Sequence, residues 1–207
     1  MPVITSIKLQ KKKAWVNLFL DGKFAFSLPA EKVVELGLKE NQELSAEQIR
    51  NLIKENEFAL VFDRVLHFLS FRPRSEKEVL DYLRKKGIGE ETQKLVINKL
   101  KKLEFLNDKQ FASWLLEKRS FDQPRGKHQL KTELLRKGID KEIVDDLLTQ
   151  RTEKQELTLA QKLIMKKLPR LANLPPEEKR KKLYSFLINR GFEWEIVKEA
   201  VDKLLEK

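Results

Sequence analysis

Two arginines lie immediately before a predicted helix, where they could bind an anionic group. Arg72 and Arg74 surround a proline just outside a helix that is expected to begin after Ser75. The first turn of a helix presents unpaired backbone N–H groups, which already attract negative charge. The arginines could therefore clamp a phosphate or a carboxylate. They could equally pair with Glu76 or Glu78 and fasten the turn, and the sequence alone favours neither interpretation.

A second group of basic residues follows about fifty positions later. Its members are Arg119, Arg125, Lys127, Lys131, Arg136 and Lys137. Lys127 and Lys131 are one helical turn apart and therefore lie on the same face of a helix. Such a group could line a concave basic surface, and we favour this binding role over simple solvation. Because Arg119, Arg125, Lys127 and Lys131 avoid the apolar positions, we expect their joint replacement by alanine to leave helicity nearly intact.

Residues for catalysis or for cofactor binding are scarce. The chain has no cysteine, which excludes disulfides, thiolate zinc sites and cysteine nucleophiles. Its two histidines, His67 and His128, have no partner that would complete a metal site or a catalytic pair. Gly126-Lys127 lacks the other residues of a phosphate-binding P-loop. We expect no catalytic residue, no cofactor and no metal, and hence a protein that is not an enzyme.

Composition points to a basic protein that stays in water. The 207 residues include 43 Lys and Arg against 32 Asp and Glu, a net charge of +11 that is spread along the chain. This suits a protein that follows a long polyanion or an extended acidic protein surface, although lysines that only solvate helices explain it about as well. No stretch approaches the roughly 20 apolar residues of a membrane span, and no signal peptide is recognised. A cytoplasmic protein is expected.

A pattern centred on glycine occurs three times. Gly87, Gly138 and Gly191 each follow a leucine by four positions and directly precede an apolar residue. The pattern predicts a helix that buries its leucine face, ends at a glycine with positive φ, and turns into a second helix. The second helices are expected at residues 90–103, 140–148 and 193–205. A further helix precedes each pair, beginning near Phe58, Asn107 and Thr152.

The first 57 residues have the alternation of a small antiparallel sheet. A hairpin of strands is expected at residues 14–20 and 23–28, and residues 3–9 could add a third strand. Asp21-Gly22 is suited to a tight hairpin turn, and Ser45 begins a capping box for a helix. The run Lys11–Lys13 could contact phosphate, but a solvated connection is the favoured interpretation.

Together these patterns predict a mainly α protein built from three tandem three-helix repeats of the helix-turn-helix kind. Each repeat is too small for a large core of its own, so neighbours should stack into an elongated curved solenoid. The N-terminal β-hairpin module is expected to precede it, and the protein is expected to be a monomer. The predicted domains are residues 1–57, 58–106, 107–151 and 152–207.

Two stretches resemble the RecX family of RecA regulators. Phe71–Val79 (FRPRSEKEV) resembles the Arg-x-Arg-Ser-Glu-x-Glu box of that family's first repeat. Leu106–Ala112, Arg119, Gly126 and Leu134–Ile139 (LLRKGI) resemble the family's second repeat. The resemblance runs from about residue 58 to the C-terminus, and the N-terminal strands resemble an extension carried by the longer members.

The resemblance implies a cytoplasmic, non-enzymatic protein that binds the RecA nucleoprotein filament. It implies restraint of filament growth, ATP hydrolysis and strand exchange in recombinational DNA repair and the SOS response. Both groups of basic residues then become candidates for contact with RecA or DNA. The alternative is a helical-repeat protein that binds DNA without sequence specificity. Acidic first turns at Glu90, Asp140 and Glu193 argue against insertion of these helices into the major groove.

Overall fold

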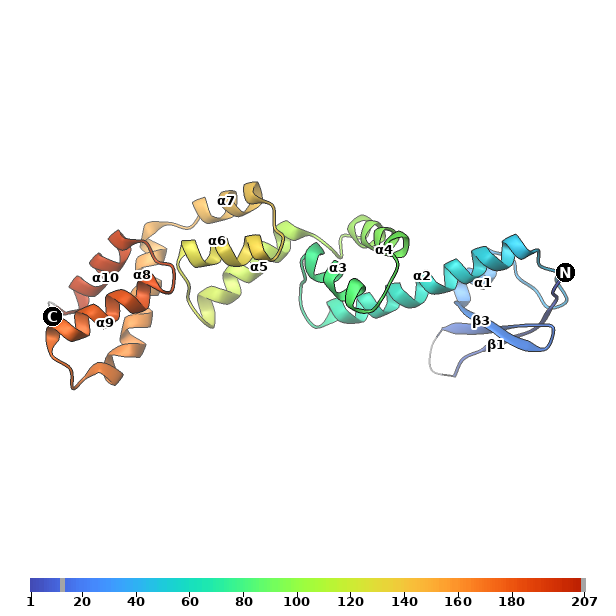
Figure 1. Ribbon diagram of the computed structural model, residues 1–207, viewed down its shortest axis with the longest axis horizontal. Helices are drawn as coiled ribbons and strands as arrows, with labels where there is room; N and C mark the ends of the chain where they lie inside the picture. Colours follow the sequence, from blue (N-terminus) through green and yellow to red (C-terminus); the bar gives the residue numbers. More distant parts are fainter. Residues whose placement is uncertain (12–13, 206–207) are drawn as a thin grey trace. The chain divides into compact units, whose positions relative to one another are not determined.

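The computed structural model describes residues 1–11 and 14–205 (Figure 1). Lys12 and Lys13 of the predicted lysine connection lie outside the described residues. The chain divides into two compact units, Met1–Arg72 with Tyr82–Phe105, and Pro73–Asp81 with Leu106–Lys207. Within the described ranges, no helix combines the length and the apolar content needed to cross a membrane.

The first unit begins with the predicted three-stranded antiparallel sheet. Its strands are β1 (Ile4–Leu9), β2 (Trp15–Leu20) and β3 (Lys23–Pro29), in that order across the sheet. Asp21 and Gly22 have φ of 48° and 79°, the positive values that a tight hairpin turn requires. Val16, Leu18 and Leu28 lie in the buried core of this module. A short helix, α1 (Ala30–Glu35), follows.

A single long helix, α2 (Ala46–Ser70), connects the sheet module to the rest of the unit. The predicted capping box is present, because the Ser45 side chain accepts from the backbone of Gln48 and the Gln48 side chain accepts from that of Ser45. The helix predicted from Phe58 is therefore the second half of α2 and does not begin there. Residues 46–70 contain no proline or glycine, so nothing interrupts the helix between its two halves.

The remaining helices agree with the predicted repeats. The helices of the first pair are α3 (Glu76–Lys85) and α4 (Glu90–Lys102). Those of the second repeat are α5 (Asp108–Phe121), α6 (Lys127–Arg136) and α7 (Lys141–Thr149). Those of the third are α8 (Glu153–Lys167), α9 (Pro176–Ile188) and α10 (Trp194–Leu205), with a 3-10 turn, η1 (Leu168–Leu171), between the first two.

The three glycines have the predicted conformation. Gly87, Gly138 and Gly191 have φ of 71°, 82° and 80°. In each case the N–H of the following residue donates to the carbonyl of the leucine four positions before the glycine. The distances are 3.2 Å from Ile88 to Leu83, 3.2 Å from Ile139 to Leu134, and 3.3 Å from Phe192 to Leu187. These bonds satisfy carbonyl groups that the end of a helix leaves unpaired.

Candidate interaction surface: the second repeat and its two junctions

The first junction joins the first turn of α3 to the turn that ends α6. Ser75 Oγ donates to the Lys137 carbonyl at 2.8 Å, and Lys77 Nζ donates to the Arg136 carbonyl at 3.0 Å. Ser75 is completely buried and also accepts from the backbone of Glu78, as an N-cap residue does. This serine of the Arg-x-Arg-Ser box therefore both starts its own helix and holds the end of another.

Two acidic side chains complete the first junction. Asp108 Oδ1, at the start of α5, accepts from the Glu76 backbone N–H at 2.9 Å. Lys137 Nζ forms an ion pair with Glu78 on the other side. A Cβ on Gly138 would lie 2.7 Å from the Lys77 side chain, so the lysine packs directly on the glycine turn.

The second junction repeats this arrangement one repeat later, but two of its bonds are between backbones, and a third runs from Gln129 Nε2 to the Asn189 carbonyl at 3.4 Å. The first turn of α6 meets the turn that ends α9, where Gly126 N donates to Arg190 O at 2.9 Å and His128 N donates to Gly191 O at 3.1 Å. A Cβ on Gly126 would lie only 2.1 Å from the Gly191 carbonyl oxygen. Positive ends of helix dipoles thus meet negative ends at both junctions.

Between the junctions, two of the candidate arginines bind a buried carboxylate. Arg119 Nε and a terminal nitrogen of Arg119 donate to the two Glu133 oxygens at 3.0 and 2.5 Å, and Arg125 donates to Glu133 Oε2 at 2.6 Å. The Glu133 side chain is only 6% exposed. Burial raises the pKa of Glu133, but the Arg119 hydrogen bond and the nearby arginine charges outweigh it and lower the pKa overall. We call these three residues the Glu133 cluster.

The Glu133 cluster changes one expectation from the sequence. Alanine at both Arg119 and Arg125 would leave a buried charge without its partners, which is strongly destabilising. The joint replacement of four basic residues is therefore no longer expected to leave the helices intact. The signal for the cluster was present, because Glu133 falls between Leu130 and Leu134 on the buried side of α6, where a charged residue needs a partner.

The other candidates lie in more exposed places. Lys131 pairs with Asp145 of α7 at 2.6 Å, and Lys127 is half-buried at the start of α6. Arg136 is exposed at the end of the same helix. Arg72 and Arg74 are half-buried, and both interact with neighbouring groups. Of the eight candidates, the structure brings Arg119 and Arg125 together on Glu133.

One buried ion pair was not anticipated from the sequence. Arg151 Nε and Glu156 Oε1 are 2.7 Å apart, and their side chains are 10% and 3% exposed. Glu156 Oε2 also accepts from the Lys127 N–H at 3.3 Å, so Glu156 takes the place in the second junction that Asp108 takes in the first. Burial raises the pKa of Glu156 and lowers that of Arg151, and in each case the charge of the other residue opposes this only in part.

Comparison with known proteins assigns the family. Models of the RecX first three-helix domain, the RecX third three-helix domain and the Regulatory protein RecX N-terminal domain match residues 62–100, 153–201 and 2–45. Regulatory protein RecX of Clostridium beijerinckii is 33% identical over 208 residues, covering 99% of this chain and 97% of its own. The chain belongs to the RecX family. The resemblance to the RecX family is thereby confirmed.

Other members agree in sequence and fold. Regulatory protein RecX of Bacillus subtilis is 33% identical over 99% of this chain and 78% of its own. A crystal structure of regulatory protein RecX is 27% identical with a TM-score of 0.79, covering 98% of this chain and all of its own. The crystal structure of RecX from Lactobacillus salivarius is 29% identical with a TM-score of 0.63, over 72% of this chain and 96% of its own.

Proposed function

We propose that the protein binds the RecA nucleoprotein filament and inhibits filament extension, ATP hydrolysis and strand exchange. It acts in recombinational DNA repair and the SOS response, in the cytoplasm, and by binding alone. The observation that carries this proposal is the family match, which reaches from residue 2 to residue 201 under the name regulatory protein RecX. The even distribution of the +11 charge suits a protein that follows an extended anionic assembly.

Within the second repeat, the candidate residues divide into two roles. Arg119 and Arg125 act indirectly, because their guanidinium groups hold Glu133 and thereby fix α5 against α6. Lys127 and Arg136, at the two ends of α6, are the residues that contact the filament. Both residues lie outside the hydrogen bonds of the Glu133 cluster, although the Arg136 charge helps to lower the pKa of Glu133 and the Lys127 charge opposes the rise in the pKa of Glu156. Their removal therefore tests binding while the Arg119 and Arg125 hydrogen bonds to Glu133 stay in place.

ATP hydrolysis by RecA on single-stranded DNA provides the test. The native protein is expected to slow hydrolysis, and Lys127→Ala/Arg136→Ala is expected to need several-fold more protein for the same effect, as charges at the rim of an interface do. Lys181→Ala/Lys182→Ala removes the same charge from exposed positions on α9 and is the matched control. Equal inhibition by both variants would exclude the ends of α6 from the interface.

DNA binding without RecA is the competing outcome. The first turns of three helices are acidic, with Glu90 and Glu91 on α4, Glu142 on α7 and Glu195 on α10. These side chains would face phosphate if the helices entered the major groove. Co-sedimentation with RecA filaments and with bare DNA, at two salt concentrations, separates the two functions. Retention on bare DNA with no added retention on filaments would contradict the proposed function.

A further inference from the structure

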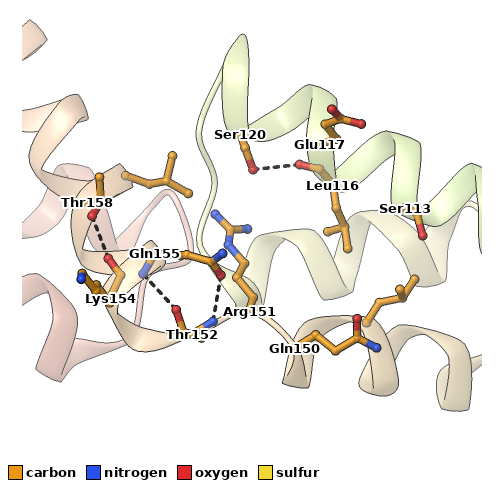
Figure 2. Close-up of a pocket in the computed structure, with 12 residues that line it drawn as sticks. Ser113, Leu116, Glu117, Ser120, Gln150, Arg151, Thr152, Lys154, Gln155 and Thr158 are labelled. Atoms are coloured by element: carbon orange, nitrogen blue, oxygen red, sulfur yellow. Dashed lines mark hydrogen bonds between the residues drawn. The ribbon is translucent and has the colours of Figure 1, made fainter.

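A cavity of about 770 Å³ lies among α5, the end of α7 and the first turns of α8, within the second unit. Figure 2 shows its lining, with Ser113, Leu116 and Ser120 of α5 facing Gln155 and Thr158 of α8. No part of the Glu133 cluster lines it. The cavity is therefore separate from the basic residues that were singled out from the sequence.

Arg151 belongs to this lining, and most of its hydrogen-bond donors are unused. A guanidinium group can bind one acceptor along its Nε edge and a second across its two terminal nitrogens. Glu156 Oε1 lies 2.7 Å from Nε as an ion pair, but this contact does not have the geometry of a hydrogen bond. The two terminal nitrogens of Arg151 are buried and find no hydrogen-bond partner among the described residues. A buried donor pair of this kind is costly unless an acceptor reaches it.

The geometry favours a carboxylate as that acceptor. A carboxylate matches the paired terminal nitrogens with two parallel hydrogen bonds. The apolar walls, formed by Leu116, Leu147 and Leu159, would hold an apolar side chain next to the acid. A phosphate backbone has no apolar group to place against these walls, so a peptide that carries a carboxylate beside an apolar side chain fits the cavity better.

We propose that this cavity binds a short acidic segment of a partner protein, with one carboxylate on the terminal nitrogens of Arg151 and an adjacent apolar side chain against the leucines. The terminal nitrogens are covered in the present conformation, so the Arg151 side chain turns toward the cavity as the segment enters. Ser113 and Thr158 lie where they would flank the bound segment. This proposal rests on the function proposed above in one respect only, namely the identity of the protein that carries the segment.

The test needs no RecA, so its outcome is independent of the filament assay. The blocked peptide acetyl-Leu-Glu-Glu-Leu-amide is titrated into 15N-labelled full-length protein, and amide and arginine Nε–H signals are followed by NMR. We expect concentration-dependent shifts at the Arg151 Nε–H and in the amides of Ser113, Ser120 and Thr158. The peptide acetyl-Leu-Gln-Gln-Leu-amide lacks the carboxylates. Its dissociation constant is expected to be at least about tenfold higher, since it loses a charge-assisted pair of bonds.

Two threonine-to-tyrosine variants distinguish binding in the cavity from binding elsewhere on the surface. Thr158→Tyr fills the cavity and should abolish the shifts. Thr132→Tyr is the matched control, because Thr132 is also an exposed helical threonine whose hydroxyl donates to the carbonyl four residues earlier. Unchanged binding by Thr158→Tyr, equal binding of the glutamine peptide, or the same cavity shifts with an oligothymidylate would each overturn the proposal.

Discussion

The two junctions of the second unit have the same arrangement of helix start, acid and glycine turn, but different groups make the hydrogen bonds. In each, an acid from the next repeat accepts the first backbone N–H of a helix, Asp108 for α3 and Glu156 for α6. In each, the first turn of that helix also meets a glycine turn. The first junction makes this contact with the side chains of Ser75 and Lys77, whereas the second adds two backbone-to-backbone bonds to the single side-chain bond of Gln129.

The difference shows where the chain can tolerate change and where it can bind. Side-chain contacts leave space that a flexible lysine can adjust, but backbone contacts leave none for a Cβ. The second junction also buries its acid beside a single arginine, whose terminal nitrogens have no hydrogen-bond partner among the described residues, whereas the Glu133 cluster supplies two arginines to one acid. Spare donors at the second junction are what make its cavity a candidate binding site.

The largest effect is expected at the cluster between the junctions. Arg119→Ala/Arg125→Ala should lower the free energy of unfolding by about 4 kcal/mol, because Glu133 remains buried without a partner. Urea unfolding followed by circular dichroism measures it. Adding Glu133→Leu should restore much of the loss, since no buried charge is then left. If the triple variant is as unstable as the double variant, the unpaired charge of Glu133 is not the cause of the lost stability.

Gly126→Ala should have the next largest effect and would break the second junction. The new Cβ would lie 2.1 Å from a backbone oxygen that cannot move alone, and such overpacking costs about 3 kcal/mol. The melting temperature and the urea midpoint report the loss. Gly89→Ala is the control, because Gly89 is also the residue before a helix but has open space around its Cα. Similar losses in both variants would contradict the close backbone contact.

Ser75→Ala removes the side chain on which the first junction depends. It should cost about 2 kcal/mol, because the N-cap bond to Glu78 is lost and the buried Lys137 carbonyl loses a donor. Ser45→Ala removes a cap in an exposed position and should cost less. If the two serines cost the same in urea unfolding, Ser75 acts only as a cap and the junction does not need it.

Gly138→Ala is expected to be milder than Gly126→Ala. The positive φ of 82° costs about 1 kcal/mol for a residue with a Cβ, and the neighbouring atoms belong to a lysine side chain that can move away. Thermal unfolding measures the change. A loss as large as that of Gly126→Ala would show that the first junction is packed as tightly as the second.

The smallest effects concern pH, and the two buried acids should respond in opposite directions. The lowered pKa of Glu133 means that its ionised form stabilises the fold above the ordinary value of 4.5, and that this is lost as pH falls through the lower folded pKa. The raised pKa of Glu156 means that ionisation costs stability at neutral pH, and that the cost disappears as pH falls through the raised pKa toward 4.5.

Each acid is tested by its glutamine variant. The free energy of unfolding of Glu156→Gln minus that of the native protein should be larger at pH 7 than at pH 5. Glu133→Gln should be less stable at neutral pH, and this deficit should shrink as pH falls below the ordinary carboxyl pKa of 4.5 and through the lowered pKa of the folded state. The same pH trend in both variants would contradict the distinction between the two acids.

Local patterns in the sequence determined much of this fold. The glycines Gly87, Gly138 and Gly191, the cap at Ser45, the helix start near Thr152 and the Asp21-Gly22 turn were all predicted and are confirmed. Each depends on φ values or on hydrogen bonds within a few residues, which neighbouring residue types determine almost alone. The continuous α2 was missed for a related reason, because the repeat pattern begins at Phe58 although no residue breaks the helix there.

Only the tertiary structure decided which charged residues find partners. Sequence analysis singled out Arg119 and Arg125 as exposed cations, but their partner Glu133 is 14 and 8 residues away on another helix. Ser75 meets Lys137 across 62 residues, and no local pattern predicts that contact. Whether an arginine binds its own chain or a partner depends on which acid the fold brings within about 3 Å of it, and that distance is set by helix packing rather than by residue type.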